Sequence, residues 1–199
     1  MLRLYISGLI EYDSLAQIYP PERKSEIEKA KTPDSKAQKY SVWRLLERAV
    51  SDTFAKPLTA YNLTKTQSGK WQSDGFYFSL SHSQSAVAVA ISDSPVGVDI
   101  ETKTFSDPER TAKKILTPTE MQTYYCSEDK PSLVIRKWCE KESIFKMRGL
   151  PHFSPCKTDT DSERVITNCV CIDNKSCTVC VATASQDDTL EIFENGEYL

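Results

Sequence analysis

Strand-like and helix-like segments occur along this chain in the same order twice. An alternating run at residues 2–6 predicts a first strand, and helices are predicted between residues 22 and 39, with a break at 32–34, and over 40–50. Strands are predicted at 58–63, 75–80, 86–91 and 96–101, helices from 117 and over 131–147, and strands again at 164–172, 177–182 and 189–193. This order predicts an α+β fold with two halves, an N-terminal half at 1–94 and a C-terminal half at 95–199.

The composition excludes several classes of protein. The 199 residues are 39% hydrophobic and 27% charged, which is typical of a globular protein with its own core. The net charge is −3, so general binding to nucleic acid is not expected. No apolar run has the length of a membrane span, and the N-terminus does not read as a secretion signal. We therefore expect a cytoplasmic protein without membrane contact, whose seven cysteines are reduced.

An acidic pair lies on the strand predicted over 96–101, which reads VGVDIE. Side chains alternate between the faces of a strand, so Asp99 and Glu101 share one face. Two carboxylates on one face repel each other when they are partly buried. A metal site and a solvated strand edge both explain the pair when this segment is considered alone.

A third carboxylate lies on the helix predicted over 131–147. At 100° per residue, one apolar stripe of this helix contains Val134, Trp138 and Phe145. Glu142 falls on the buried side of the stripe, where a carboxylate is costly unless it is compensated. An ion pair with Lys146 is one explanation. The other is a Mg²⁺ ion held jointly by Asp99, Glu101 and Glu142.

Several residues are suited to binding phosphate groups. His82 lies among hydroxyls in the run FSLSHS at 78–83, and Arg23, Lys39 and Lys70 could supply positive charge to an anionic ligand. A Ser/His hydrolase would need a nucleophile elbow with flanking glycines, which this run lacks. A histidine bonded only for structure, and lysines that are simply solvated, remain the alternative reading.

Two rival functions use other features of the same sequence. The carboxylates could serve a different Mg²⁺-dependent phosphotransferase or a nuclease. Four cysteines, at 169, 171, 177 and 180, could instead be the zinc ligands of a non-enzymatic interaction module. The zinc reading is disfavoured because residues 177 and 180 of a strand face opposite sides.

The sequence also resembles a known family. The runs GVDIE at 97–101 and WCEKESIFK at 138–146 resemble the two-part signature of 4′-phosphopantetheinyl transferases, and Asp99 and Glu142 are 43 positions apart, which fits its spacing. The run SLSHS at 79–83 resembles the family element N-[IL]-S-H-[ST], with Ser79 in place of asparagine. Gly69-Lys70 resembles its G-[KR]-P element, with Trp71 in place of proline. The length is similar to that of the monomeric Sfp type, and this resemblance implies two similar α+β halves in a pseudo-two-fold arrangement with the active site between them.

The resemblance implies an activity and a role for each matching residue. It implies that the protein transfers the 4′-phosphopantetheine group of coenzyme A to a serine of an apo acyl or peptidyl carrier protein, with Mg²⁺, and releases adenosine 3′,5′-bisphosphate. The Mg²⁺ ligands would be Asp99, Glu101 and Glu142, and Glu142 would also act as the base for the serine hydroxyl. Lys141 and Lys146 would lie near the pyrophosphate. Arg23, Lys39, Lys70, Ser81, His82 and Lys146 would contact coenzyme A.

Overall fold

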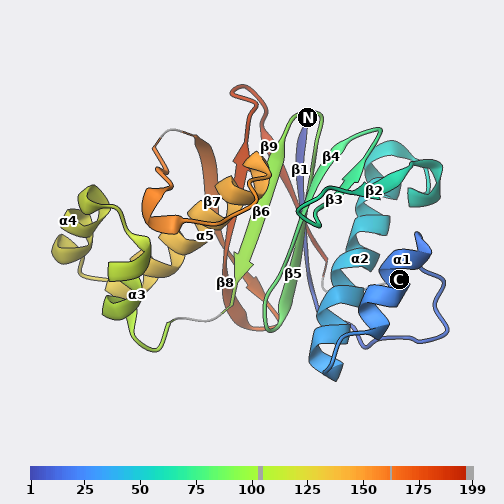
Figure 1. Cartoon of the computed structure of the whole chain (residues 1–199), viewed down its shortest axis with the longest axis horizontal. Helices are drawn as coiled ribbons and strands as arrows, with labels where there is room; N and C mark the ends of the chain where they lie inside the picture. The colour runs from blue at the N-terminus through green and yellow to red at the C-terminus, as the bar shows by residue number, and fades with distance from the viewer. Residues whose placement is uncertain (103–104, 162, 196–199) are drawn as a thin grey trace.

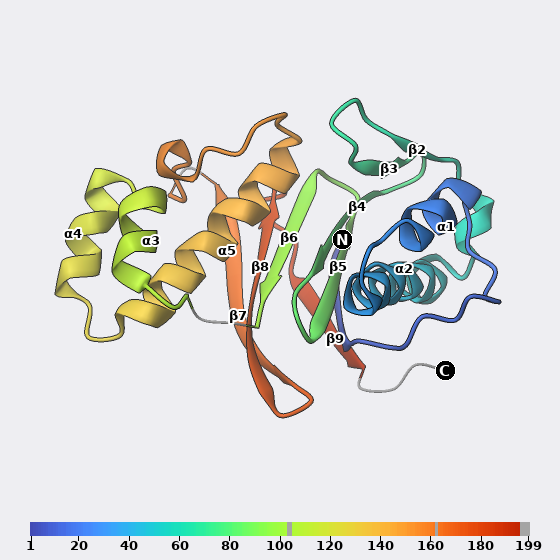
Figure 2. The same cartoon turned by 60° about the horizontal axis from the view of Figure 1, so that its bottom comes forward.

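Two β-sheets form the centre of the computed structural model, which describes residues 1–102, 105–161 and 163–195 (Figure 1). One sheet has the strand order β4-β5-β1-β9 and the other has the order β6-β8-β7, while β2 and β3 form a separate hairpin. Helices α1 and α2 lie outside the first sheet, and α3, α4 and α5 lie outside the second, as Figure 2 shows from another side. The protein is therefore a mixed α+β fold with helices on both outer faces.

The elements follow the chain in two series. The first comprises β1 (Leu2–Gly8), α1 (Pro21–Glu28), α2 (Pro33–Phe54), a 3₁₀ turn (Leu58–Ala60), β2 (Leu63–Lys65), β3 (Trp71–Ser73), β4 (Tyr77–His82) and β5 (Ala86–Ser92). The second comprises β6 (Val96–Glu101), α3 (Pro108–Ile115), α4 (Pro118–Cys126), α5 (Lys130–Arg148), a 3₁₀ turn (Pro155–Lys157), β7 (Arg164–Ile172), β8 (Lys175–Thr183) and β9 (Leu190–Asn195).

Alternation along β5 explains why the sheets pack face to face. Its valines at 87 and 89 and Ile91 belong to the core beneath α2. Its alanines at 86, 88 and 90 face the other way, into a second core that they share with Val98 of β6 and Val181 of β8. Small side chains on this face of β5 let the two sheets approach closely. The inner sheet edges β4 and β6 consequently lie beside each other.

Local signals set the ends of the helices. The predicted capping box opens α4: Thr117 Oγ1 accepts from the amide of Glu120, and the Glu120 carboxylate accepts from the amide of Thr117. Helix α5 begins at an Asp129 cap and ends at Gly149, whose φ of 63° is the left-handed conformation that glycine adopts readily. These caps fix the length of the helix that carries Glu142.

The structure corrects some of the predicted elements. The strand predicted over 58–63 is wrong, because this segment forms the 3₁₀ turn and only Leu63 enters β2. Leu58 and Leu63 are both buried, but they belong to a turn and a short strand, so their apolar character does not reflect one continuous strand. The segment predicted as a separate helix at 40–50 is part of the continuous α2. The short elements β3 and α3 were not predicted at all.

The last described strand joins the sheet of the first half. β9 runs parallel to β1, with Leu2 opposite Leu190, so it does not lie with β6, β7 and β8. Residues 196–199 of the expected C-terminal half lie outside the described residues. In the described part of the chain, no helix has both the length and the apolar character to cross a membrane.

Candidate active site

Strand β6 and helix α5 touch closely where the carboxylates lie. Gly97 makes this approach possible, since a Cβ atom at this position would stand 1.9 Å from the carbonyl oxygen of Ser143. Two residues further along β6, Asp99 is only 4% exposed. The thiol of Cys139 on α5 donates to the Asp99 carbonyl over 3.1 Å. The close packing therefore brings Asp99 against the helix that carries Glu142 and Lys146.

Within the described part of the chain, only one of the two Asp99 carboxylate oxygens has hydrogen-bond partners. Oδ1 accepts from Lys146 Nζ at 2.7 Å and from Ser81 Oγ at 2.8 Å. Oδ2 is buried and has no hydrogen-bond partner among the described residues. A buried carboxylate oxygen without a donor is costly, so its place beside two further carboxylates suits a bound cation.

The charges of the three carboxylates influence one another. Burial and the charges of Asp99 and Glu142 raise the pKa of Glu101 to about 7, although hydrogen bonds from Ser83 and Trp138 oppose the shift. Burial and the Asp99 charge likewise raise the pKa of Glu142, and the ammonium of Lys146 opposes that shift. The pKa values of Glu101 and Glu142 remain raised although Lys146 is nearby, so further positive charge would stabilise the charged forms of these carboxylates.

Lys146 lies between two of these carboxylates. Its Nζ atom is 2.7 Å from Asp99 and 3.6 Å from Glu142. Burial lowers its pKa, but the two negative charges outweigh this effect and raise the pKa overall. Within the described residues, no three His, Cys, Asp or Glu side chains converge closely enough to hold one metal ion. The lysine is thus the cation that the acidic cluster holds in this structure.

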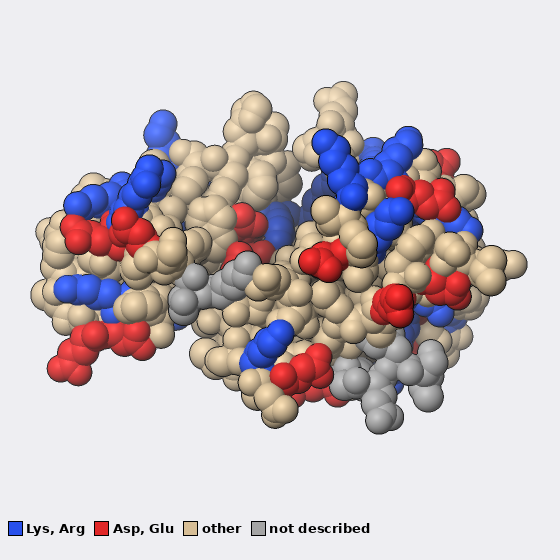
Figure 3. Space-filling view, turned by 90° about the horizontal axis from the view of Figure 1, so that it is seen from below, with Lys and Arg blue, Asp and Glu red and all other residues tan. Residues whose placement is uncertain are grey.

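Lys146 also adjoins a group of basic side chains. Desolvation and the charges of Lys146, Arg23 and Lys39 lower the pKa of His82, while Asp99 opposes the shift. Lys70 donates to the main-chain carbonyl of Lys146 over 2.6 Å, and its pKa is lowered by burial and by the charge of that lysine. In Figure 3, basic side chains lie at the bottom of a hollow between the two halves, with acidic ones on its wall.

Two pockets adjoin the charged cluster. One, of about 230 Å³, is lined by Lys70, Lys146, Trp71 and Phe78 among others. The other, of about 440 Å³, reaches Glu101 from the side of α5, β7 and β8. Room for a ligand therefore exists on both sides of the carboxylates.

Arg23 is held firmly at the edge of the basic cluster. Its guanidinium donates to Glu26 at 3.1 Å and to the carbonyl of Lys39 at 2.7 Å, and stacks over the ring of Trp43. Burial lowers its pKa to about 10. Its Nε atom is buried and has no hydrogen-bond partner in the ranges that the structure describes. The acidic neighbour Glu26 takes up part of its charge, which leaves less for a ligand.

Lys141 lies away from the site, contrary to the expectation that it contacts a pyrophosphate. Its side chain is fully buried, and its Nζ atom lies 2.7 Å from Glu120 of α4 and donates to the carbonyls of Pro155 and Thr158. Its neighbour Glu142 points instead to Lys146. Adjacent helix positions differ by about 100° in direction, so the two side chains cannot both face the cluster.

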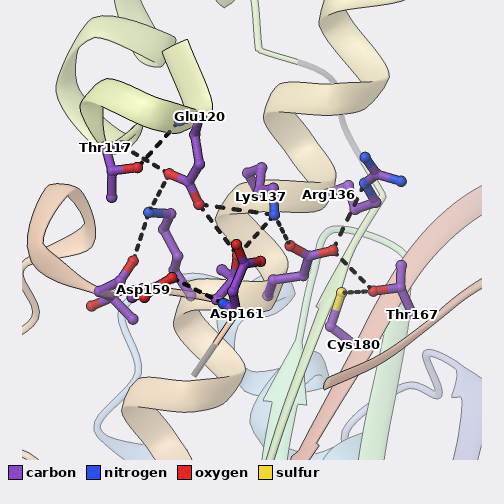
Figure 4. Close-up of polar contacts among 12 residues, drawn as sticks. Thr117, Glu120, Arg136, Lys137, Asp159, Asp161, Thr167 and Cys180 are labelled. Atoms are coloured by element: carbon purple, nitrogen blue, oxygen red, sulfur yellow. Dashed lines mark hydrogen bonds and ion pairs between the residues drawn. The ribbon is translucent and has the colours of Figure 1, made fainter. Parts of the chain in front are cut away.

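Lys141 is joined through Glu120 to a network of charged side chains that includes Lys137 (Figure 4). Lys137 contacts Glu140 at 2.9 Å, Thr160 at 2.8 Å and Glu120 at 3.8 Å. Glu140 also accepts from Thr167 on β7 over 3.3 Å. The network ties α4, the loop after α5 and β7 to the helix that carries Glu142.

The predicted apolar stripe of α5 is partly wrong. Trp138 and Phe145 are only half-buried, whereas Cys139, Ser143 and the charged Lys141 are fully buried. The helix faces β6 with small side chains, because Gly97 and Ser143 are in near contact there. The large aromatic rings pack against Phe153 instead.

The four cysteines considered as zinc ligands do not form a common site. Cys169 and Cys171 are exposed on β7, whereas Cys177 and Cys180 are buried on β8. Their partners across the two strands are other residues, with Cys169 opposite Thr178 and Cys171 opposite Ser176. In the described part of the chain the zinc reading is therefore wrong.

Sequence reasoning missed the role of the hydroxyls on β4 and directly after it. Ser79 and Ser83, like Ser81, contact β6 directly. Their spacing of two residues, which directs all three to one face of a strand, was the available signal.

The comparison with known proteins concerns the second half of the chain. No curated protein matches the sequence. A family model described as the 4′-phosphopantetheinyl transferase superfamily matches residues 95–189. The match begins just before β6 and includes α5, so it contains Asp99, Glu101 and Glu142. The segment that carries the three carboxylates is thus similar to this superfamily of transferases, which modify carrier proteins.

Proposed function

We propose that this protein transfers the 4′-phosphopantetheine group of coenzyme A to a serine of an apo acyl or peptidyl carrier protein and releases adenosine 3′,5′-bisphosphate. The observation that carries the proposal is the buried Asp99 Oδ2 atom, which has no partner among the described side chains and lies within the matched segment, beside two carboxylates of raised pKa. Positive charges adjoin this acidic cluster, as a reaction between a pyrophosphate and a hydroxyl needs.

The order of the strands supports the Sfp type with two similar halves. The first half has the order β4-β5-β1 and the second has β7-β8-β6, each with two antiparallel pairs. If β1, β4 and β5 correspond to β6, β7 and β8, one half repeats the other. We keep 1–94 and 95–199 as the proposed halves, with β9 returning to the first sheet. Both halves supply residues to the site, which favours an active monomer.

Asp99, Glu101 and Glu142 would hold the Mg²⁺ ion. All three offer the oxygen ligands that Mg²⁺ prefers, and Asp99 already has a free buried oxygen. The ion would neutralise negative charge on the pyrophosphate. Lys146, which lies against Asp99 and Glu142, would then be free to pair with a phosphate of the donor.

Glu142 is suited to accept the proton of the carrier serine. Its raised pKa makes it a better base than an ordinary carboxylate, and its side chain is 25% exposed. The serine oxygen forms a bond to the β-phosphorus of coenzyme A, and the bond from that phosphorus to the bridging oxygen breaks. The proton passes to Glu142, directly or through water, and adenosine 3′,5′-bisphosphate leaves with the bridging oxygen.

The basic residues would bind the donor. Lys70 and Lys146 line the smaller pocket, and His82 lies in the field of Arg23 and Lys39. These charges would hold the phosphates of coenzyme A. We propose a different task for Lys141, because its ammonium is bound to Glu120 and two carbonyls. It would fix the loop after α5 and, through it, the helix itself.

The test is incubation with coenzyme A, Mg²⁺ and a panel of apo carrier proteins, followed by intact-protein mass spectrometry. One carrier should gain the mass of a phosphopantetheinyl group. The Glu142→Gln and Asp99→Ala variants should lose at least about 100-fold in rate, while Glu191→Gln, an exposed carboxylate on β9, should retain it.

Two outcomes would contradict the proposal. Full activity of Asp99→Ala or Glu142→Gln would exclude the metal site. Phosphodiester cleavage of nucleic acid without any need for coenzyme A would favour the rival reading as a Mg²⁺-dependent nuclease.

A further inference from the structure

Three serines, two on β4 and one directly after it, connect the two sheets through their side chains. Ser79, Ser81 and Ser83 lie at alternate positions, and their Oγ atoms accept from the amides of Val98, Ile100 and Thr102 at 3.0, 3.2 and 3.1 Å. The backbone of β4 pairs with β5, and that of β6 pairs with β8. The hydroxyls thus take the place of the backbone carbonyls that would otherwise pair with this edge of β6. We call these three residues the serine ladder.

Two members of the serine ladder also donate to the carboxylates. Ser81 Oγ donates to Asp99 Oδ1 at 2.8 Å, and Ser83 Oγ donates to Glu101 Oε2 at 3.2 Å. In both cases the hydroxyl donates to the carboxylate of one residue and accepts a hydrogen bond from the backbone amide of the next residue. A single hydroxyl therefore fixes both the backbone and the side chain of a two-residue unit of β6.

Ser79 lacks the second half of this arrangement. Its hydroxyl accepts from the amide of Val98, but the preceding residue is Gly97, which has no carboxylate. Ser79 is 2% exposed and Ser81 is 5% exposed, so the two positions are similarly buried. The chain therefore contains its own control, a serine with the same backbone bond and no acidic partner.

The proton of Ser81 is already in use. A hydroxyl has one proton to donate, and here it goes to Asp99. The oxygen accepts from Ile100 and from Lys146 Nζ at 3.1 Å. The hydroxyl thus has no proton left for a phosphate oxygen unless it leaves Asp99. This differs from the role in phosphate binding that the family resemblance implies for Ser81.

We propose that Ser81 and Ser83 are positioning residues, which orient Asp99 and Glu101 for the metal ion while the serine ladder holds β6 in register with β4. The inference rests on the proposed function, because it concerns the same carboxylates. A carboxylate whose orientation is already fixed by a hydrogen bond loses less conformational freedom when it binds an ion than a carboxylate that rotates freely. Ser79 contributes to the register alone.

Three alanine variants, at Ser79, Ser81 and Ser83, test the inference by two measurements. Hydrogen exchange by NMR should show faster exchange, by about tenfold, at the amide that each variant leaves without its partner. Electron paramagnetic resonance of Mn²⁺ should show a dissociation constant raised about tenfold in Ser81→Ala and Ser83→Ala. Ser79→Ala should remain within about twofold of the unmodified protein, and Ser83→Thr, which keeps the hydroxyl, should bind Mn²⁺ as the unmodified protein does.

Each alternative result would contradict one part of the proposal. Unchanged Mn²⁺ binding in Ser81→Ala and Ser83→Ala would overturn the positioning role, while the proposed function would stand if carriers are still modified. Equal losses in Ser79→Ala and Ser81→Ala would reduce the serine ladder to general packing. An unmodified protein that binds no Mn²⁺ would refute the metal site and the positioning role together. Unaltered amide exchange in all three variants would refute the ladder itself.

Discussion

The close approach of β6 and α5 predicts that Gly97→Ala is severely disruptive. A Cβ atom at position 97 would stand 1.9 Å from the carbonyl oxygen of Ser143 and 2.5 Å from the amide nitrogen of Met147. These two atoms belong to residues four apart on α5, the spacing of a helical hydrogen bond. Side-chain movement cannot relieve the clash, because both contacts are backbone atoms. The strand and the helix would have to separate by about 1.5 Å to restore ordinary contact.

The separation should affect both stability and activity. Overpacking of a well-packed interior costs about 1–3 kcal/mol, and a clash with helix backbone belongs at the upper end, so we expect the free energy of unfolding to fall by about 3 kcal/mol. Asp99 is two residues from Gly97, and Glu142 adjoins Ser143, so the distance between two proposed metal ligands should change as well. A misplacement of about 1 Å can cost about 100-fold in rate.

Urea denaturation followed by circular dichroism, and carrier modification at a temperature where the variant is folded, would measure these two effects. Gly69→Ala is the matched control for the stability measurement, since a Cβ there meets no described atom within 4 Å and only the φ of 83° is unfavourable. We expect that control to lose about 1 kcal/mol in the free energy of unfolding. Native stability of Gly97→Ala would refute the packing argument. A folded variant with native activity would show that the site does not depend on this contact.

Two further predictions concern groups outside the acidic cluster. Burial raises the pKa of Glu47 to about 7, although Arg44 opposes the shift. Between pH 4.5 and 7 the folded protein therefore binds more protons than the unfolded chain. As the pH rises through this range, the Glu47 carboxyl lowers the free energy of unfolding. Glu47→Gln should therefore raise the free energy of unfolding by about 1–3 kcal/mol above pH 7 and not below pH 4.5, and a flat difference across urea titrations would contradict this. Lys141→Met should cost about 3–5 kcal/mol, because it removes the ammonium closest to Glu120, leaves Lys137 at 3.8 Å beside that carboxylate, and takes the donor from the carbonyls of Pro155 and Thr158. Lys141→Met with Glu120→Gln should recover part of the loss in the same titration; no recovery would show that the pair is not coupled.

The alternation along β6 was the most informative part of the sequence. It predicted that Asp99 and Glu101 share a face, and the raised pKa of Glu101 in the field of Asp99 agrees with that. Helical spacing predicted a contact between Glu142 and Lys146, which the structure has at 3.6 Å. Both inferences depend only on the geometry of a single element, which is why a sequence can support them.

The positions that the sequence did not reveal depend on contacts between elements. Lys141 is buried because the segment around Pro155 folds back over α5 and offers it two carbonyls, and no periodicity of the helix predicts this. The half-buried position of Trp138 has a similar cause, since Gly97 and Ser143 take the closest contact with the sheet. Helical spacing gives the direction of a side chain but not what lies there.

The serine ladder shows how the edges of two sheets can form a site. The edge of a sheet normally exposes amides that would pair with another strand. Here the free edge of β6 faces the free edge of β4. The serine hydroxyls accept hydrogen bonds from every second backbone amide along the edge of β6. A backbone carbonyl in their place could accept hydrogen bonds from these amides but could not donate one to a carboxylate. The hydroxyls satisfy the edge of β6 and bind Asp99 and Glu101 at the same time, so the acidic pair and the junction of the two sheets occur at the same place.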